Sequence, residues 1–223
     1  MKTVLDKEDL IFSPPKPGCV LSITGLPGSG SRVYDRSPYG KQGTVTGAGW
    51  VRLPSGLWVL SLDGVDDNVL ISDWDNELLG SDYTIEQWVK SDNLLVRGYT
   101  IGVASWSAGA FYIRTNSTTR KLEYSAYGGN DIVSGTALSE DTWYHIAVRV
   151  LSGIAQFYLN GIVDGSPNSG HTLSGTHTLY IGKGHVGNEW SGLIGYTCLH
   201  CRALSAFEIR RRFERERSLF GVW

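Results

Sequence analysis

The amino-acid sequence predicts an all-β protein, an antiparallel β-sandwich jelly roll made of many short strands. Its composition is the first observation, because 28 Gly, 8 Trp and 11 Tyr against 1 Met suit tight turns and pleated sheets better than a helical bundle. The second is a strict alternation in residues 83–89 and 142–150, which places Ile85 and Ile146 on apolar faces. The third is Asn160-Gly161, a strong signal for a two-residue hairpin. A chain of 223 residues fits one such domain.

The strand candidates are short apolar or alternating runs, each bounded by turn-forming Gly, Ser, Asn or Asp. The first covers residues 18–23, and a glycine-rich loop segment follows it. Further strands are expected at 58–62, 69–71, 83–89, 100–106, 110–115, 122–127, 142–150, 154–159, 179–183 and 193–199. This spacing is typical of a sandwich.

The two ends of the chain differ from this middle. Residues 1–17 are charged and then proline-rich, so we expect an extended N-terminal arm ahead of a sandwich at residues 18–204. In residues 205–223, Ser205 and Glu208 form a capping box that predicts a helix beginning at Ala206. The apolar residues after this helix either fold back onto the domain or contact a neighbouring subunit of a homo-oligomer or larger assembly. They are Leu219, Phe220, Val222 and Trp223.

Bulk properties exclude some classes of function. The net charge of −2 and a pI near 6.2 do not match the basic surface of a nucleic-acid-binding domain. No apolar run is long enough to span a membrane. The first ten residues contain acidic side chains where a secretory leader would be apolar, so no signal peptide is visible.

Six segments, in this order, resemble a laminin G-like domain of the concanavalin A-like lectin/glucanase superfamily. They are LDGVDD at 62–67, YTIEQWVKS at 83–91, TWYHIAVRV at 142–150, FYLNG at 157–161, LYIGK at 179–183 and RALSAFEIRRRF at 202–213. The resemblance covers residues 18–215 and implies a noncatalytic module that recognises glycans or a cell surface in an extracellular or virion assembly. A structural or decoration protein of a virus particle is the alternative, and a glycoside hydrolase is the third possibility.

Candidate ligand-binding residues are aromatic and polar side chains at expected loops and strand ends. Sugars stack their apolar faces on aromatic rings and bind planar polar groups through their hydroxyls. The candidates are Trp74, Trp106, Tyr127 and Trp190, with Asp73, Asn130 and Asn188. Each aromatic residue has the alternative role of capping one end of the sandwich.

A second set lies on the face opposite Ile85 and Ile146. Alternation places Glu86, Trp88, His145 and Arg149 there, either as acid/base machinery or, as we expect, as a satisfied polar network under covering loops. A hydrolase would need two carboxylates flanking the sugar bond. Asp73, Asp75 and Glu77 have alternate spacing, but they occur in an expected loop. We therefore expect no catalytic residues.

The resemblance also implies one structural calcium ion, held by oxygen ligands between an early Asp turn and the last strand. Asp35 matches the first part. Gly195-Tyr196 stands where many relatives have Asp-Glu, which leaves Asp63 and Asp66 as possible substitutes.

The three cysteines leave at least one unpaired. Cys198 and Cys201 have the spacing of half a zinc site, without a second half in the sequence. They are otherwise small core thiols. The resembled fold, in which first and last strands are neighbours, implies a disulfide from Cys19 to Cys198 or Cys201 as a further alternative.

Overall fold

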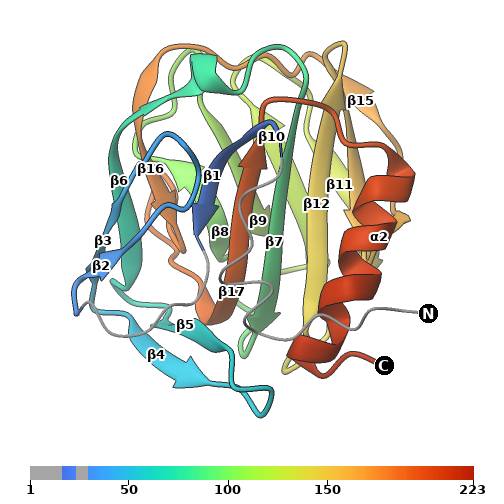
Figure 1. The fold of residues 1–223 in the computed structure, drawn as a ribbon. Helices are drawn as coiled ribbons and strands as arrows, with labels where there is room; N and C mark the ends of the chain where they lie inside the picture. The colour runs from blue at the N-terminus through green and yellow to red at the C-terminus, as the bar shows by residue number, and fades with distance from the viewer. Residues whose placement is uncertain (1–16, 24–29) are drawn as a thin grey trace.

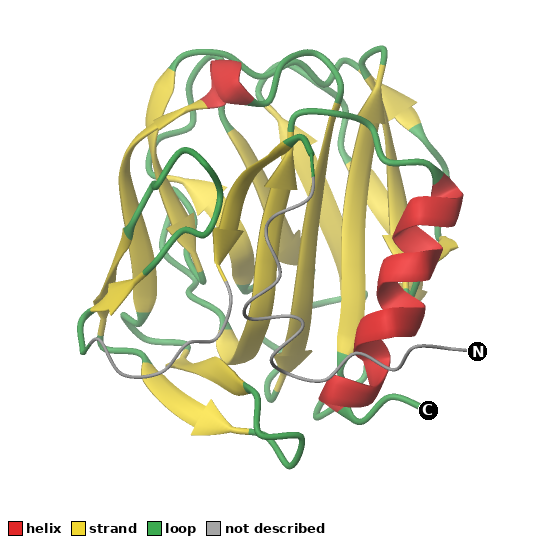
Figure 2. Ribbon diagram, viewed as in Figure 1, coloured by secondary structure: helices red, strands yellow, loops and turns green. Residues whose placement is uncertain are grey.

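The computed structural model describes residues 17–23 and 30–223, which form two antiparallel β-sheets packed face to face (Figure 1). The predicted β-sandwich is confirmed. Figure 2 shows that strands dominate the described part and that one long helix lies near the C-terminus. The predicted arm, residues 1–17, lies outside the described residues except for Pro17.

The first sheet has nine strands in the described part of the chain. Its main path is β14-β13-β12-β7-β17-β5-β4, while β1 pairs with β17 and β15 with β13. The strands are β1 (Cys19–Ile23), β4 (Gly49–Arg52), β5 (Trp58–Asp63), β7 (Tyr83–Ser91), β12 (Tyr144–Leu151), β13 (Ile154–Leu159), β14 (Ile162–Val163), β15 (Asn168–Ser169) and β17 (Ser191–His200). The predicted pairing of first and last strands is therefore present.

The second sheet has eight strands among the described residues, in the order β11-β10-β9-β8-β16-β6-β3-β2. They are β2 (Arg32–Val33), β3 (Gly43–Thr46), β6 (Asn68–Asp75), β8 (Tyr99–Val103), β9 (Phe111–Thr115), β10 (Lys121–Ala126), β11 (Ile132–Ala137) and β16 (Thr176–Ile181). The strand predicted at 69–71 is longer than expected, so Asp73 and Trp74 are strand residues and not loop residues. A 3₁₀ helix, η1 (Asn76–Leu78), follows it.

The interior lies between the two sheets, where the alternating residues meet. Ile85 and Ile146 are both fully buried in it, as the alternation predicts. Gln87 shares their face, and its Nε2 atom donates to the Thr100 carbonyl at 3.2 Å and to Thr197 Oγ1 at 3.1 Å. A polar group on the core face is tolerated here because it is hydrogen-bonded.

The helix α2 (Ala206–Glu216) begins where the capping box predicts and packs against the outer face of the nine-stranded sheet, alongside β12 (Figure 1). Ser205 Oγ accepts from the Glu208 N–H, and Glu208 Oε2 accepts from the Ser205 N–H at 2.8 Å. Ile209 and Phe213 point into the sheet and are buried. Among the described residues, no helix has the length and apolarity needed to cross a bilayer.

The apolar tail folds back onto the domain through the 3₁₀ helix η2 (Arg217–Phe220). The Phe220 ring stacks on Trp88 with ring centroids 4.2 Å apart, and the Leu219 carbonyl accepts from Ser55 Oγ at 2.6 Å. Both residues are buried, which agrees with the first of the two expected alternatives, folding back onto the domain, and not with their assignment as partner contacts. Val222 is half-buried against the same cluster, and Trp223 alone of the four is exposed, at 90%.

Candidate functional site

An aromatic cluster lies on the outer face of the eight-stranded sheet. Alternation on β9 sends Phe111 and Ile113 into the core and leaves Tyr112 on the outside. Two residues from connecting segments pack on Tyr112, Trp106 after β8 and His185 between β16 and β17, and Tyr127 after β10 packs on Trp106. We call Trp106, Tyr112, Tyr127 and His185 the aromatic cluster.

The rings of the aromatic cluster contact one another directly. Trp106 is stacked on His185 with centroids 5.2 Å apart, lies 5.0 Å from Tyr112, and meets Tyr127 edge-on at 5.8 Å. Tyr112 is buried and supports the others, Trp106 and His185 are half-buried, and Tyr127 is 44% exposed. The cluster is therefore a preformed aromatic surface that is open to solvent.

Charged groups beside the aromatic cluster are paired. The Arg114 guanidinium lies 4.5 Å from the Tyr112 centroid, and its Nε atom donates to Glu123 Oε2 at 2.8 Å. Lys183 Nζ lies 2.7 Å from Glu189 Oε1. Partial burial, with the nearby charge of Arg114, lowers the pKa of His185 below its usual value. The imidazole is therefore neutral at pH 7 and extends the uncharged surface.

The structure brings together two of the predicted ligand residues, Trp106 and Tyr127. Asn130 is exposed in the segment that follows Tyr127. Asn188 is exposed in the segment that contains His185, and its carbonyl accepts from the Tyr99 N–H at 3.1 Å. Sequence reasoning missed Tyr112 and Arg114, although their alternation with Phe111 and Ile113 was a usable signal.

Trp74 and Trp190 do not belong to the candidate site. They are 0% and 1% exposed and lie in the core between the sheets. The Trp74 Nε1–H donates to Asn76 Oδ1 at 2.8 Å, which lets the indole be buried without an unsatisfied donor. Both residues are structural, which corrects the prediction.

The acidic residues at alternate spacing act as local hydrogen-bond acceptors. Asp75 Oδ1 accepts from the Glu77 N–H at 3.0 Å and caps η1, and Glu77 Oε1 accepts from the Gly175 N–H at 3.3 Å. The contact of Asp73 is through its backbone carbonyl, which accepts from Lys41 Nζ. These contacts stabilise the turn at the end of β6.

The predicted calcium ligands fall into two places. Both Asp35 oxygens accept backbone N–H groups, at 2.8 Å from Ser22 and 2.9 Å from Lys41, so Asp35 organises its own turn. Asp63 and Asp66 come together with Asp67 at the β5–β6 turn, and Asp35 is not part of this group. A calcium ion there stays a prediction. It is tested by measuring the melting temperature of EDTA-treated protein with and without added calcium.

The polar network predicted on the outer face of the nine-stranded sheet lies under α2. Glu86 is 0% exposed and lies 2.7 Å from Arg212, 3.0 Å from His200 and 3.5 Å from His145. Burial alone would raise the pKa of Glu86, but the charge of Arg212 and the two imidazoles hold it well below the usual value. Arg149 is elsewhere, with its guanidinium 5.7 Å from the Tyr158 ring, so Arg212 of the helix replaces it as the partner of Glu86.

Two antiparallel sheets packed face to face, one covered by a helix and the other carrying an open aromatic surface, define a lectin-like β-sandwich. Residues 63–210 match the family model Laminin_G_3, described as the concanavalin A-like lectin/glucanases superfamily. The chain belongs to this superfamily, as its sequence motifs suggested. No curated protein matches the chain.

Solved structures share the fold at low sequence identity. A Trypanosoma rangeli sialidase is 18% identical with a TM-score of 0.70, over 92% of this chain and 34% of the sialidase. Domain 4 of AbnA, a GH43 extracellular arabinanase from Geobacillus stearothermophilus solved with arabinotriose, is 16% identical with a TM-score of 0.69, over 86% of this chain and 96% of the domain. The binding domain of Paraclostridial Mosquitocidal Protein 1 is 16% identical with a TM-score of 0.69, over 88% and 52% of the two chains. The chain thus spans about a third of the sialidase.

Proposed function

We propose that this chain is a noncatalytic recognition module that binds a glycan on the aromatic cluster. The observation that carries the proposal is that Trp106 and His185 pack on the buried ring of Tyr112 and that Tyr127 packs on Trp106. Sugar rings bury their C–H faces on such surfaces, and nearby polar groups fix their orientation. Asn130 and Asn188 are exposed in the segments that carry Tyr127 and His185, and their amide groups are suited to bind the hydroxyls.

The electrostatics favour a neutral sugar over an anionic one. Arg114 lies against Tyr112 and Lys183 precedes His185 by two residues, and each is paired with a carboxylate. An anionic sugar would have to displace Glu123 or Glu189 from its partner. A neutral oligosaccharide needs no such exchange.

The similar structures support glycan binding in general terms. The arabinanase domain was solved with arabinotriose, and the mosquitocidal protein domain is a binding domain. At 16% identity, each shares the fold with this chain. We propose a role without catalysis because the acids weighed as hydrolase residues, Asp75 and Glu77, already cap a turn.

An architectural role in an extracellular or virion assembly is the second candidate. Trp223 favours it, since its side chain is 90% exposed at the end of a tail that otherwise folds back. Large exposed aromatic residues frequently mark protein contacts. Such a role predicts self-association or partner binding that does not depend on the aromatic cluster.

A glycan array followed by calorimetry tests the proposal. We expect binding to neutral oligosaccharides and about tenfold weaker binding for Trp106→Ala, a loss of about 1.4 kcal/mol. Phe207→Ala is the matched control, because Phe207 is 73% exposed on α2, which covers the other sheet. If the protein binds no glycan, or if both variants lose the same affinity, the glycan-binding proposal is wrong and the architectural role is favoured.

A further inference from the structure

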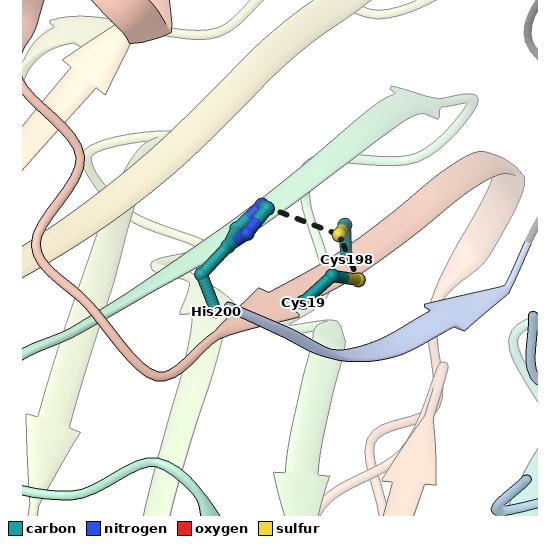
Figure 3. A group of neighbouring side chains, drawn as sticks. All are labelled: Cys19, Cys198 and His200. Carbon is teal, nitrogen blue, oxygen red and sulfur yellow. Dashed lines mark hydrogen bonds between the residues drawn. The ribbon is translucent and has the colours of Figure 1, made fainter. Parts of the chain in front are cut away.

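A group of two thiols and an imidazole is buried between the first and last strands of the nine-stranded sheet. β1 and β17 are paired antiparallel, so Cys19 comes to lie beside Cys198 although 179 positions separate them. His200 follows Cys198 by two residues on β17 and therefore projects from the same face. Figure 3 shows the three side chains pointing toward one another, with dashed lines joining the two sulfurs and the imidazole.

The three donor atoms are close together and shielded from water. Cys19 Sγ lies 3.1 Å from Cys198 Sγ, which lies 3.3 Å from His200 Nε2. Exposed fractions are 4% for Cys19, 1% for Cys198 and 0% for His200. Sulfur and imidazole nitrogen form the donor set that thiophilic metal ions prefer.

We propose that Cys19, Cys198 and His200 form a binding site for a thiophilic divalent cation, with zinc as the ion that fits best. Zinc takes two thiolates and an imidazole in a tetrahedral arrangement, with Zn–S bonds of about 2.3 Å and hence sulfurs about 3.8 Å apart. The sulfurs would have to separate by roughly 0.7 Å from their observed 3.1 Å. Small side-chain rotations on two adjacent strands are sufficient for this.

A carboxylate lies next to the three clustered donors without being one of them. Glu86 Oε2 lies 3.0 Å from His200 Nε2, so the same nitrogen faces both Cys198 and Glu86. One N–H cannot be directed at two acceptors at full strength, whereas an ion bound by the nitrogen and the two sulfurs would remove this competition and leave Glu86 as the neighbouring charge. The second Glu86 oxygen lies 3.5 Å from His145 Nε2.

The charges of the ion, the two thiolates, Glu86 and Arg212 sum to zero when zinc is bound. Two thiolates neutralise the divalent ion, and Arg212, 2.7 Å from Glu86, neutralises the carboxylate. Uncompensated charge in a protein interior is costly, so a neutral arrangement is required for a stable site. The ion would join β1 to β17 and thereby fix the first strand to the last.

This site differs from the zinc half-site in the sequence. Cys201 is exposed and lies outside the group, while Cys19 and His200 replace it. A Cys19–Cys198 disulfide is the competing use of the thiols. It would need an oxidant to remove two electrons and two protons, would bring the sulfurs to about 2.05 Å, and would leave His200 with Glu86 as its partner.

Zinc titration of the full chain tests the proposal. The protein is reduced, treated with a chelator, incubated with zinc chloride, desalted, and analysed by mass spectrometry for bound metal. We expect stoichiometric zinc and a higher melting temperature for the native chain and for Cys201→Ser, the matched control. Zinc should be lost from Cys19→Ser and Cys198→Ser. Cobalt in place of zinc should give thiolate-to-metal charge-transfer absorption in the native chain, a readout that does not depend on variants that fold poorly.

Three results would overturn the site. One is that the native chain retains no zinc after reduction. This holds also for a chain that was isolated with a Cys19–Cys198 disulfide and then reduced. The second is zinc retained by both cysteine variants while circular dichroism shows them folded. The third is a cobalt spectrum without thiolate absorption.

Discussion

The outer faces of the two sheets follow the same alternation, but one is covered by a helix and the other is open to solvent. On the nine-stranded sheet, Glu86 and Trp88 lie beneath α2 and η2 and are 0% exposed. On the eight-stranded sheet, Trp106 and Tyr127 remain accessible. Trp106 packs on Tyr112, and Tyr127 packs on Trp106. A polar or aromatic residue on a non-core face therefore indicates function only when no other element covers it.

The difference lies in what the residues can contact. Glu86 and Arg212 form a buried ion pair, and Trp88 Nε1–H donates to Glu216 Oε2 at 2.8 Å. These partners come from the helix and bind Glu86 Oε2 and the Trp88 indole N–H. Trp106 and Tyr127 have aromatic neighbours, and their remaining surface is free for a ligand. The covered face contributes to stability, and the open face is the one to which we assign the proposed recognition.

Removing Arg212 should have the largest effect on the covered face. Arg212→Ala leaves Glu86 buried without its cation, which typically costs about 3–5 kcal/mol. Urea unfolding monitored by tryptophan fluorescence measures this loss. Arg211→Ala is the matched control, since the neighbouring Arg211 is exposed, and it should leave the free energy of unfolding nearly unchanged. Equal effects of the two substitutions would show that the helix is not a structural cover.

Removing Phe220 tests whether the tail belongs to the same cover. Phe220 is stacked on Trp88 and tilted against Trp143, with ring centroids 4.2 and 4.9 Å away. Phe220→Ala should cost about 3 kcal/mol, at the low end for a buried phenylalanine because a terminal segment can relax. Trp223→Ala should be nearly neutral for stability. A stable Phe220→Ala monomer would contradict the packing of the tail.

The sequence predicted the fold where alternation reports on a shared core. Ile85 and Ile146 lie on long strands buried on one face, and the capping box at Ser205 is a local signal that needs no tertiary contact. Strands of two residues such as β2 and β14 have no measurable period. They exist because a neighbouring strand pairs with them.

The candidate site was only half predictable for a related reason. Trp74 and Trp106 look alike in sequence, but Asn76 satisfies the indole of Trp74 inside the core. His185 joins Trp106 through the packing of segments that are distant in sequence. Residue type identified suitable aromatic side chains, while exposure depended on tertiary contacts that no local pattern encodes.

Tyr127 provides a finer test of the open face. Tyr127→Ala removes an accessible ring, so we expect glycan affinity to fall by several-fold, less than for Trp106→Ala, because its contact with Trp106 is edge-on. The melting temperature should not change. Tyr127→Phe retains the ring and should retain most of the affinity in calorimetry. A loss of stability in place of affinity would make Tyr127 part of the structural core.

The smallest expected effect concerns the pH dependence of the cap that begins the covering helix. The hydrogen bond from Arg202, followed by those of the Ser205 cap, lowers the pKa of Glu208 to about 2. A carboxyl group with a lowered folded-state pKa stabilises the protein above its unfolded pKa, about 4.5, and this contribution is lost as the pH falls through about 2.

Glu208→Gln should therefore reduce stability at pH 7 by no more than about 1 kcal/mol, since the pair is partly exposed to solvent. The difference from the native chain should shrink between pH 4.5 and pH 2, where the native carboxylate becomes protonated. Urea unfolding of both chains across this range measures it. Glu214→Gln, in the same helix, is the control. A stability difference between the native chain and Glu208→Gln that does not depend on pH would show that the charge of Glu208 does not stabilise the helix cap.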